Sequence, residues 1–254
     1  MKRKAILIES SNVTGQDDLP GARVDIQNWV NFLTSALGGA WLSHEIVTMS
    51  KPTSAEVKKE IEVDLDCYSF VAFSGHGRDG TVVLNEYWDD FPISSLRPKS
   101  RQGTMIVDSC RGLDEGRPYS FSRTAILASE SVGREVVMNS REGRSTKFAS
   151  YLTSLQESLS NHKASWGTSL SSSAAGVVEM LACAKGQGAG EDPKAGGYYT
   201  ALLLQSADIW QQGTTTNGIH TTKNAHDHAA KMLPAQQTPE YKPQNLAFPF
   251  AVRA

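Results

Sequence analysis

The sequence predicts an α/β fold in which helices cover both faces of a mostly parallel central sheet. Short apolar segments of strand length alternate along the chain with segments whose apolar residues recur every three or four positions. The strand-like segments are apolar almost throughout, which is typical of parallel strands buried on both faces. At 254 residues the chain has the length of one large α/β domain, and we expect a single domain over residues 1–254.

The elements follow from these patterns in order. Strands are predicted at residues 5–9, 44–49, 68–77, 103–112, 177–184 and 246–252, with a weaker candidate at 134–140. Helices are predicted at residues 20–37, 53–65, 147–159, 198–210 and 225–233. The second helix begins with a capping box, because Thr53 is followed three residues later by Glu56.

Two further segments are predicted to be loops, and a proline marks the last strand. Glycines and polar residues at 186–197 and 213–224 predict loops. Pro249 in the last strand predicts that this strand lies at an edge.

Composition limits the partners and the compartment. Lys and Arg total 25 against 27 Asp and Glu, so the net charge of −2 gives no general attraction for a nucleic acid backbone. The apolar run after MKRK is too short for an export signal, and no run approaches the roughly 18 residues of a membrane helix. Cys67, Cys110 and Cys183 are odd in number, which favours free thiols and a reducing compartment. We therefore expect a cytoplasmic protein with neither a nucleic acid nor a membrane as partner.

Two polar turns follow predicted strands, FSGHG with His76 and IVDSCRG with Cys110. The carboxyl ends of parallel strands meet at one edge of a sheet, where sites commonly form. If the two strands are neighbours, His76 can serve a Cys110 nucleophile as a base or lie beside it as an imidazolium. The main-chain N–H groups of Gly77 and Cys110 are candidate oxyanion donors. Taken alone, Cys110 fits a buried thiol and His76 a turn residue; their conjunction favours a catalytic dyad.

These turns also carry a resemblance. FSGHG, DSCRG, LPGARVDIQNWVNFL (19–33) and AKGQGAGEDPKAGGYYTALLL (184–204) resemble the caspase-like cysteine proteases, especially the bacterial metacaspases and orthocaspases. The closing QQTPEYKPQNLAFPFAV (236–252) is similar to the end of that family. The resemblance implies the caspase-hemoglobinase fold and peptide cleavage through an acyl-enzyme. It also implies a large segment over about 1–170 and a small segment over about 171–254.

The resemblance places Asp25, Ser74 and Asp108 in the primary specificity pocket. Two carboxylates there favour an Arg or Lys side chain in a protein or peptide substrate. Two departures from the metacaspase pattern are visible: Ala22 stands where a cysteine is usual, and Arg111 and Gly112 stand where His-Ser-Gly is usual.

No cofactor is expected. The only close acidic pair in the EYWDDFP segment, Asp89 and Asp90, gives thin support for calcium activation and fits an exposed loop equally well. Basic residues between the catalytic turns and the small segment are candidate sites of cleavage by the protein itself or by an activating protease: Arg117, Arg123, Arg134, Arg141, Arg144 and Lys163. An activating protein is the other expected partner, and the resemblance suggests a cell-death or antiphage defence setting.

Four alternatives remain open at this point. The domain could be a catalytically silent interaction module, or a caspase-like protease with non-basic specificity. A cysteine hydrolase acting on small amides would share the dyad. A metal protein using His220, His226 and His228 is the least favoured, because residues two apart on a helix point in different directions.

Overall fold

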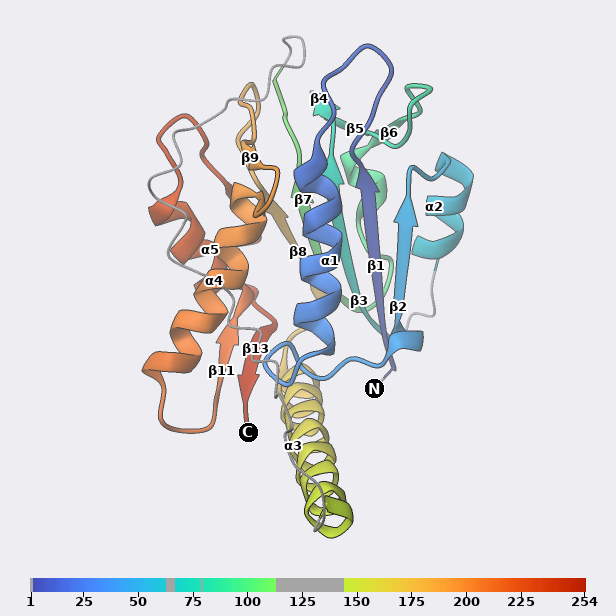
Figure 1. Cartoon of the computed structure of the whole chain (residues 1–254). Helices are drawn as coiled ribbons and strands as arrows, with labels where there is room; N and C mark the ends of the chain where they lie inside the picture. The colour runs from blue at the N-terminus through green and yellow to red at the C-terminus, as the bar shows by residue number, and fades with distance from the viewer. Residues whose placement is uncertain (1, 63–66, 79, 113–143) are drawn as a thin grey trace.

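The computed structural model describes residues 2–62, 67–78, 80–112 and 144–254 (Figure 1). Its strands are β1 (Lys2–Ser10), β2 (Ile46–Ser50), β3 (Cys67–Gly75), β4 (Gly77–Arg78), β5 (Thr81–Val83), β6 (Asp90–Pro92), β7 (Gln102–Asp108), β8 (Gly176–Leu181), β9 (Glu191–Asp192), β10 (Gly196–Gly197), β11 (Gly218–Thr221), β12 (Glu240–Lys242) and β13 (Pro249–Arg253). Its helices are α1 (Pro20–Thr34), α2 (Ser54–Ile61), α3 (Arg144–Ser172), α4 (Tyr198–Gly213) and α5 (Thr222–Met232), with 3-10 turns at Ser43–Glu45 and Ile93–Leu96.

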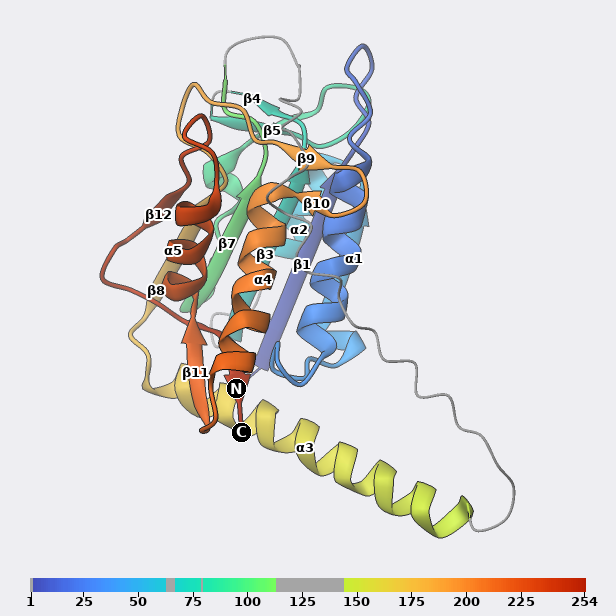
Figure 2. The same ribbon diagram turned by 60° about the vertical axis from the view of Figure 1, so that its left-hand side comes forward.

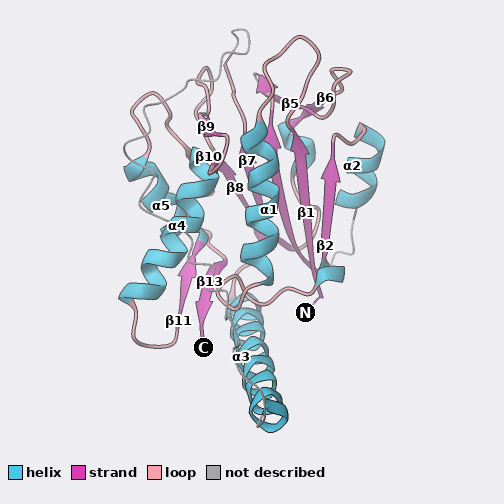
Figure 3. Cartoon of the chain, in the orientation of Figure 1, coloured by secondary structure: helices cyan, strands magenta, loops and turns pink. Residues whose placement is uncertain are grey.

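A six-stranded sheet in the order β12-β8-β7-β3-β1-β2 forms the centre of the molecule (Figure 3). All neighbouring pairs are parallel except β12 with β8, so the predicted mostly parallel sheet is confirmed. The strands are apolar throughout because both of their faces are buried. In β1, for example, Ala5 and Leu7 join one core while Ile6 and Ile8 join the other.

Helices lie on both faces, as predicted. The larger core lies under α1, α4 and α5 and includes Trp29, Tyr199 and Ala229. The other core is closed by α2 and by the small β4-β5-β6 sheet, through Val57 and Phe91. The Thr53–Glu56 capping box at the start of α2 is confirmed, with the Thr53 hydroxyl accepting from the Glu56 N–H.

Both segments expected to be loops contain short strands. Residues 186–197 include the β9-β10 ribbon, and residues 213–224 include β11, which pairs with β13. These strands are two to four residues long and depend on pairing across the fold, which local sequence patterns do not reveal. Pro249 begins β13, and among the described strands β13 pairs with β11 alone, as its predicted edge position requires. The strand candidate at 134–140 lies outside the described residues.

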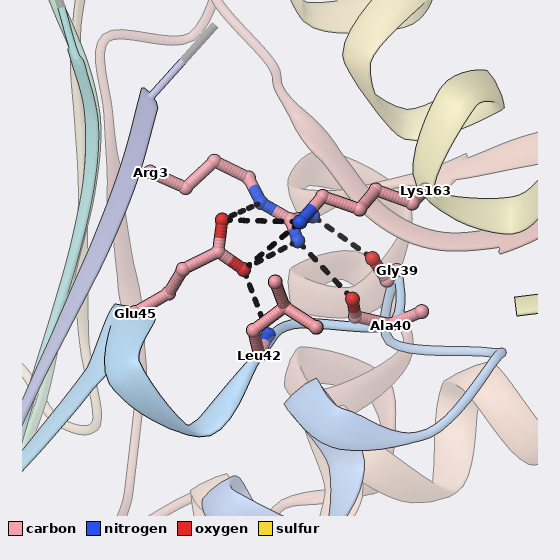
Figure 4. A network of polar contacts seen from close by, with 6 residues as sticks. All are labelled: Arg3, Gly39, Ala40, Leu42, Glu45 and Lys163. Atoms are coloured by element: carbon pink, nitrogen blue, oxygen red, sulfur yellow. Dashed lines mark hydrogen bonds and ion pairs between the residues drawn. The ribbon is translucent and has the colours of Figure 1, made fainter. Parts of the chain in front are cut away.

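The long helix α3 points away from the carboxyl edge of the sheet and projects beyond the body (Figure 2). Its last turns pack on the larger core through Trp166 and Leu170. A polar network anchors the same end (Figure 4): Glu45 accepts from Arg3 Nη2 at 2.8 Å and from Lys163 Nζ at 3.3 Å. Arg3 also donates to the carbonyl oxygens of Gly39 and Ala40, so each nitrogen of this buried guanidinium donates a hydrogen bond.

Among the described helices, none is long and apolar enough to cross a membrane.

Candidate active site

The register of the sheet brings the two predicted turns together. Ser74 on β3 is the register partner of Asp108 on the neighbouring parallel strand β7. His76 and Cys110 each follow two residues later, so they leave the same edge of the sheet at the same level. Gly77 packs against the Cys110 turn, because a Cβ at Gly77 would lie 2.8 Å from the Cys110 carbonyl oxygen.

His76 is held by main-chain groups on both sides. Its N–H donates to the Ser10 carbonyl, and its own carbonyl accepts from the Val83 N–H. Its ring Nε2 lies 2.9 Å from the Asp17 carbonyl oxygen, and since a carbonyl only accepts, Nε2 must carry a proton. In the neutral ring, Nδ1 is then the nitrogen that can take a proton from a thiol. Burial lowers the pKa of His76, against the raising effect of the Asp17 carbonyl, so the neutral ring is favoured.

Cys110 is engaged by the segment that follows β8. The Ala189 N–H donates to the Cys110 sulfur at 3.4 Å, and the sulfur lies 3.7 Å from the Ala189 carbonyl. Burial raises the pKa of the Cys110 thiol, and the negative charges of Asp108 and Glu191 add to this, whereas the Ala189 N–H opposes it. The thiol is therefore neutral at pH 7. Among the described residues, no hydrogen bond joins Cys110 to His76. In this conformation the His76 ring contacts Asp17 and the Cys110 sulfur contacts Ala189 instead.

The three expected pocket residues lie together beneath these turns. Asp25 on α1 accepts from the Ser74 hydroxyl at 2.5 Å and from the Gly197 N–H at 3.0 Å. Asp108 accepts from the main chain and the hydroxyl of Thr200, at 2.9 and 2.8 Å. Burial, followed by the charge of Asp108, raises the pKa of Asp25 well above its ordinary value. Burial likewise raises the pKa of Asp108 to about 6, and among the described residues no cation forms an ion pair with either carboxylate.

Two glycines approach these carboxylates closely. A Cβ at Gly196 would lie 2.1 Å from an Asp25 oxygen, and one at Gly197 would lie 2.4 Å from an Asp108 oxygen. Gly196 also has a φ of +96°, which glycine adopts without strain. The carboxylates therefore lie at the N-terminus of α4, where main-chain N–H groups and the helix dipole favour negative charge.

Glu191, a residue that sequence reasoning missed, joins this acidic cluster. It accepts from the N–H groups of Gly21 and Ala22 at the start of α1, whose own cap residue, Leu19, has no side-chain oxygen. Burial raises the pKa of Glu191 to about 7, and the charges of Asp108 and Asp18 contribute. Its position in a glycine-rich segment gave no signal, since the contact joins residues about 170 positions apart.

Asp89, Asp90 and Arg111, which the sequence singles out, each form hydrogen bonds or an ion pair with other residues. Asp89 caps α2 by accepting from the Ser54 N–H and hydroxyl, and Asp90 forms an ion pair with Arg78. Arg111, one of the departures from the metacaspase pattern, donates to the Cys183 carbonyl and to Glu240, which ties the Cys110 turn to β12.

The three histidines of the metal alternative do not converge. His220 contacts the Ser206 hydroxyl, His226 the Tyr199 hydroxyl and His228 the Gln205 side chain. Over the described ranges, no three His, Cys, Asp or Glu side chains are grouped to hold a metal. Among the candidate cleavage sites, Arg117, Arg123, Arg134 and Arg141 lie outside the described residues.

Comparisons with known proteins identify the fold. The fold resembles that of the crystal structure of caspase-1 from Spodoptera frugiperda, with a TM-score of 0.57 and 11% identity over 98% of this chain and 89% of that one. A structural genomics target protein from Geobacter sulfurreducens also has a TM-score of 0.57, with 15% identity over the whole of both chains. No curated protein matches the sequence significantly.

The structure thus has the α/β caspase-hemoglobinase fold. The caspase domain family matches residues 2–250, and the chain belongs to that family of cysteine peptidases, whose fold implies protein substrates.

Proposed function

We propose that this protein is a cysteine endopeptidase that cleaves protein substrates after Arg or Lys through a His76–Cys110 dyad. The observation that carries the proposal is the shared register of the two turns, which brings a thiol and an imidazole to one level above a buried acidic pair. Membership of the caspase family supports the reaction class, and the acidic pair supports the basic specificity.

The reaction follows from the side chains present. His76 Nδ1 takes the thiol proton as Cys110 Sγ attacks the scissile carbonyl carbon. The N–H groups of Gly77 and Cys110 are the proposed donors to the resulting oxyanion. The leaving amine receives the proton from His76, and the acyl-enzyme forms. Water then attacks the acyl-enzyme, losing a proton to His76, and the thiol is restored.

A basic substrate side chain would supply a cation to the acidic pair, which has none among the residues that the structure describes. Asp25 and Asp108 are the proposed pocket carboxylates, with Ser74 fixing Asp25. Glu191 lies near both carboxylates and adds a third negative charge. In the present conformation Gly197 and Ala189 contact Asp25 and Cys110, so substrate binding requires the segment over 186–197 to shift.

Three further parts of the proposal rest on family resemblance. We propose that the chain functions as one domain with its large and small segments meeting near residue 170. We also propose a cytoplasmic location, activation by a partner protein or by proteolysis in a bacterial cell-death or defence pathway, and no cofactor requirement.

Fluorogenic peptides ending in Arg, Lys, Asp or Leu test the function, with and without calcium. We expect cleavage after Arg and Lys that is lost in both Cys110→Ala and His76→Ala. Cleavage after Asp or Leu would retain the dyad and reject the basic pocket. If no peptide is cleaved and a peptidyl-Arg electrophile does not label Cys110, the domain is a silent interaction module.

A further inference from the structure

Two exposed aromatic side chains lie at the tip of the β5-β6 hairpin, which belongs to the small sheet that begins directly after His76. Tyr87 is 83% exposed and Trp88 38% exposed, in the turn between β5 and β6. Val83 at the end of β5 donates its N–H to the His76 carbonyl, so the turn starts level with the histidine. Single exposed apolar residues are common on protein surfaces, whereas adjoining exposed apolar side chains often mark a binding site.

The contacts of this turn keep the two aromatic side chains on the surface. Trp88 has a φ of +62°, a region that bulky side chains rarely adopt and that often marks a functional position. Buried Asn85 fixes the turn, since its side chain donates to the Pro52 carbonyl and accepts from the Tyr87 N–H. The Arg78 guanidinium lies 5.4 Å from the centre of the Trp88 ring, so one ring face is covered by a cation.

The tip is also connected to His76 through the loop after β1. Trp88 Nε1 donates to the Thr14 carbonyl at 2.9 Å, and the Thr14 N–H donates to the Glu86 carbonyl. His76 Nε2 donates to the Asp17 carbonyl of the same loop. Thr14 and Asp17 are three residues apart and span at most about 11 Å, so with the two hydrogen bonds of 2.9 Å the ring nitrogens of Trp88 and His76 lie within about 17 Å of each other, a distance that a short extended peptide spans.

The chemistry decides which part of a substrate reaches this tip. His76 must protonate the leaving amine, so the part of the peptide after the scissile bond departs on the His76 side. The acidic cluster of Asp25, Asp108 and Glu191 receives the residue before that bond. We propose that Tyr87 and Trp88 bind an apolar side chain of the substrate one to three positions after the scissile bond, an inference that rests on the proposed function.

Peptides of matched length test this inference. Both internally quenched peptides carry Arg before the scissile bond. One carries Phe and Leu after that bond, and the other carries Gly and Ser after it. A peptidyl-Arg aminomethylcoumarin, which has no residue after the scissile bond, reports the proposed function separately. We expect kcat/KM to be about tenfold higher for the apolar peptide.

Tyr87→Ala should bring this ratio close to one, and Trp88→Ala should reduce it as well. Tyr87→Ala is the more decisive variant, because its side chain is almost fully exposed and its loss spares the Trp88–Thr14 bond. Ile209→Ala, which removes an exposed apolar side chain of α4, is the control and should keep the ratio.

Equal cleavage of the two peptides by the parent, or an apolar preference that persists in Tyr87→Ala, overturns the inference while the coumarin substrate still reports activity. If the coumarin substrate is not cleaved, calorimetric binding of both peptides to the Cys110→Ala protein replaces the kinetics. Tighter binding of the apolar peptide that is lost on adding Tyr87→Ala supports the inference, and equal binding rejects it.

Discussion

Gly77 lies so close to Cys110 that no side chain fits between them. A Cβ at Gly77 would lie 2.8 Å from the Cys110 carbonyl oxygen and 2.7 Å from the Ser109 hydroxyl. Gly77→Ala must therefore push the two turns apart, at a cost of about 1–3 kcal/mol in stability. Because the Gly77 N–H is a proposed oxyanion donor, we expect kcat to fall at least about tenfold. Steady-state kinetics beside urea denaturation measure both effects.

The matched control is Gly167→Ala on α3, where a Cβ would meet nothing within 4 Å. Alanine favours helix over glycine by about 1 kcal/mol, so this variant should be as stable as the parent or more so, with unchanged kinetics. If Gly77→Ala retains full kcat, the close approach of the two turns is not needed for catalysis.

The buried acidic pair predicts that the parent protein loses stability as the pH rises. The pKa of Asp108 is about 6 in the folded chain and near 3.8 in the unfolded chain, so the folded state binds a proton more tightly. The free energy of unfolding should therefore fall between about pH 4 and pH 6, by up to about 3 kcal/mol. Asp108→Asn keeps an acceptor for Thr200 and removes the charge. We expect it to be more stable than the parent by about 1–3 kcal/mol at pH 7.5 and similar at pH 4.

Urea denaturation at both pH values measures this difference. Asp227→Asn removes an ion pair with Lys223 at a part-exposed site and should change stability by less than about 1 kcal/mol. A destabilised Asp108→Asn protein at pH 7.5 would show that Thr200 needs the carboxylate, and that the pair serves the fold rather than a substrate.

Substrate binding should have the opposite pH dependence. A guanidinium is attracted by ionised carboxylates, and the pKa values of Asp108 and Glu191 are about 6 and about 7. KM for an Arg substrate should therefore fall as the pH rises from about 5 to 8. In Glu191→Gln the part of the change near pH 7 should be lost, because that carboxyl is gone, while the part near pH 6 that comes from Asp108 should remain. A KM that does not vary over this range would reject the acidic pocket.

The Arg3–Glu45–Lys163 network predicts unequal contributions to stability. Glu45→Ala leaves the buried Arg3 guanidinium without its carboxylate, and we expect a loss of about 2–4 kcal/mol. Lys163→Ala removes a more exposed partner and should cost less than about 1 kcal/mol. The Arg3 hydrogen bonds hold the pKa of Glu45 below 4.5, against its burial, so the stabilisation is present above that pH. The effect of Glu45→Ala should thus shrink as the pH falls below 4.5 and the carboxyl is protonated, which thermal unfolding at several pH values tests.

The long apolar strands of the fold were predictable from the sequence and the short strands were not, and the helix predicted at 147–159 extends over Arg144–Ser172. The strands β1, β3 and β7 are buried on both faces, so their apolar residues identify them directly. The strands β4, β9 and β10 have two residues each and form because their partners are present. In the sequence, a strand of two residues cannot be distinguished from a turn.

The candidate site divides in the same way. His76 and Cys110 could be placed because each follows a strand whose end the sequence marks. The proton carried by His76 Nε2 depends on the carbonyl of Asp17, a group that every residue possesses. Glu191 becomes part of the site only when the fold brings it to the N-terminus of α1. Main-chain partners and distant contacts of this kind require the structure.

Residues 189–197 contact three different parts of the site. Ala189 contacts the Cys110 sulfur, Glu191 accepts from the first turn of α1, and Gly197 donates to Asp25. Exposure of the nucleophile and opening of the acidic pocket are consequently not independent events. A ligand that displaces this segment from one contact should weaken the others, so access to the thiol and binding in the acidic pocket should depend on the same displacement.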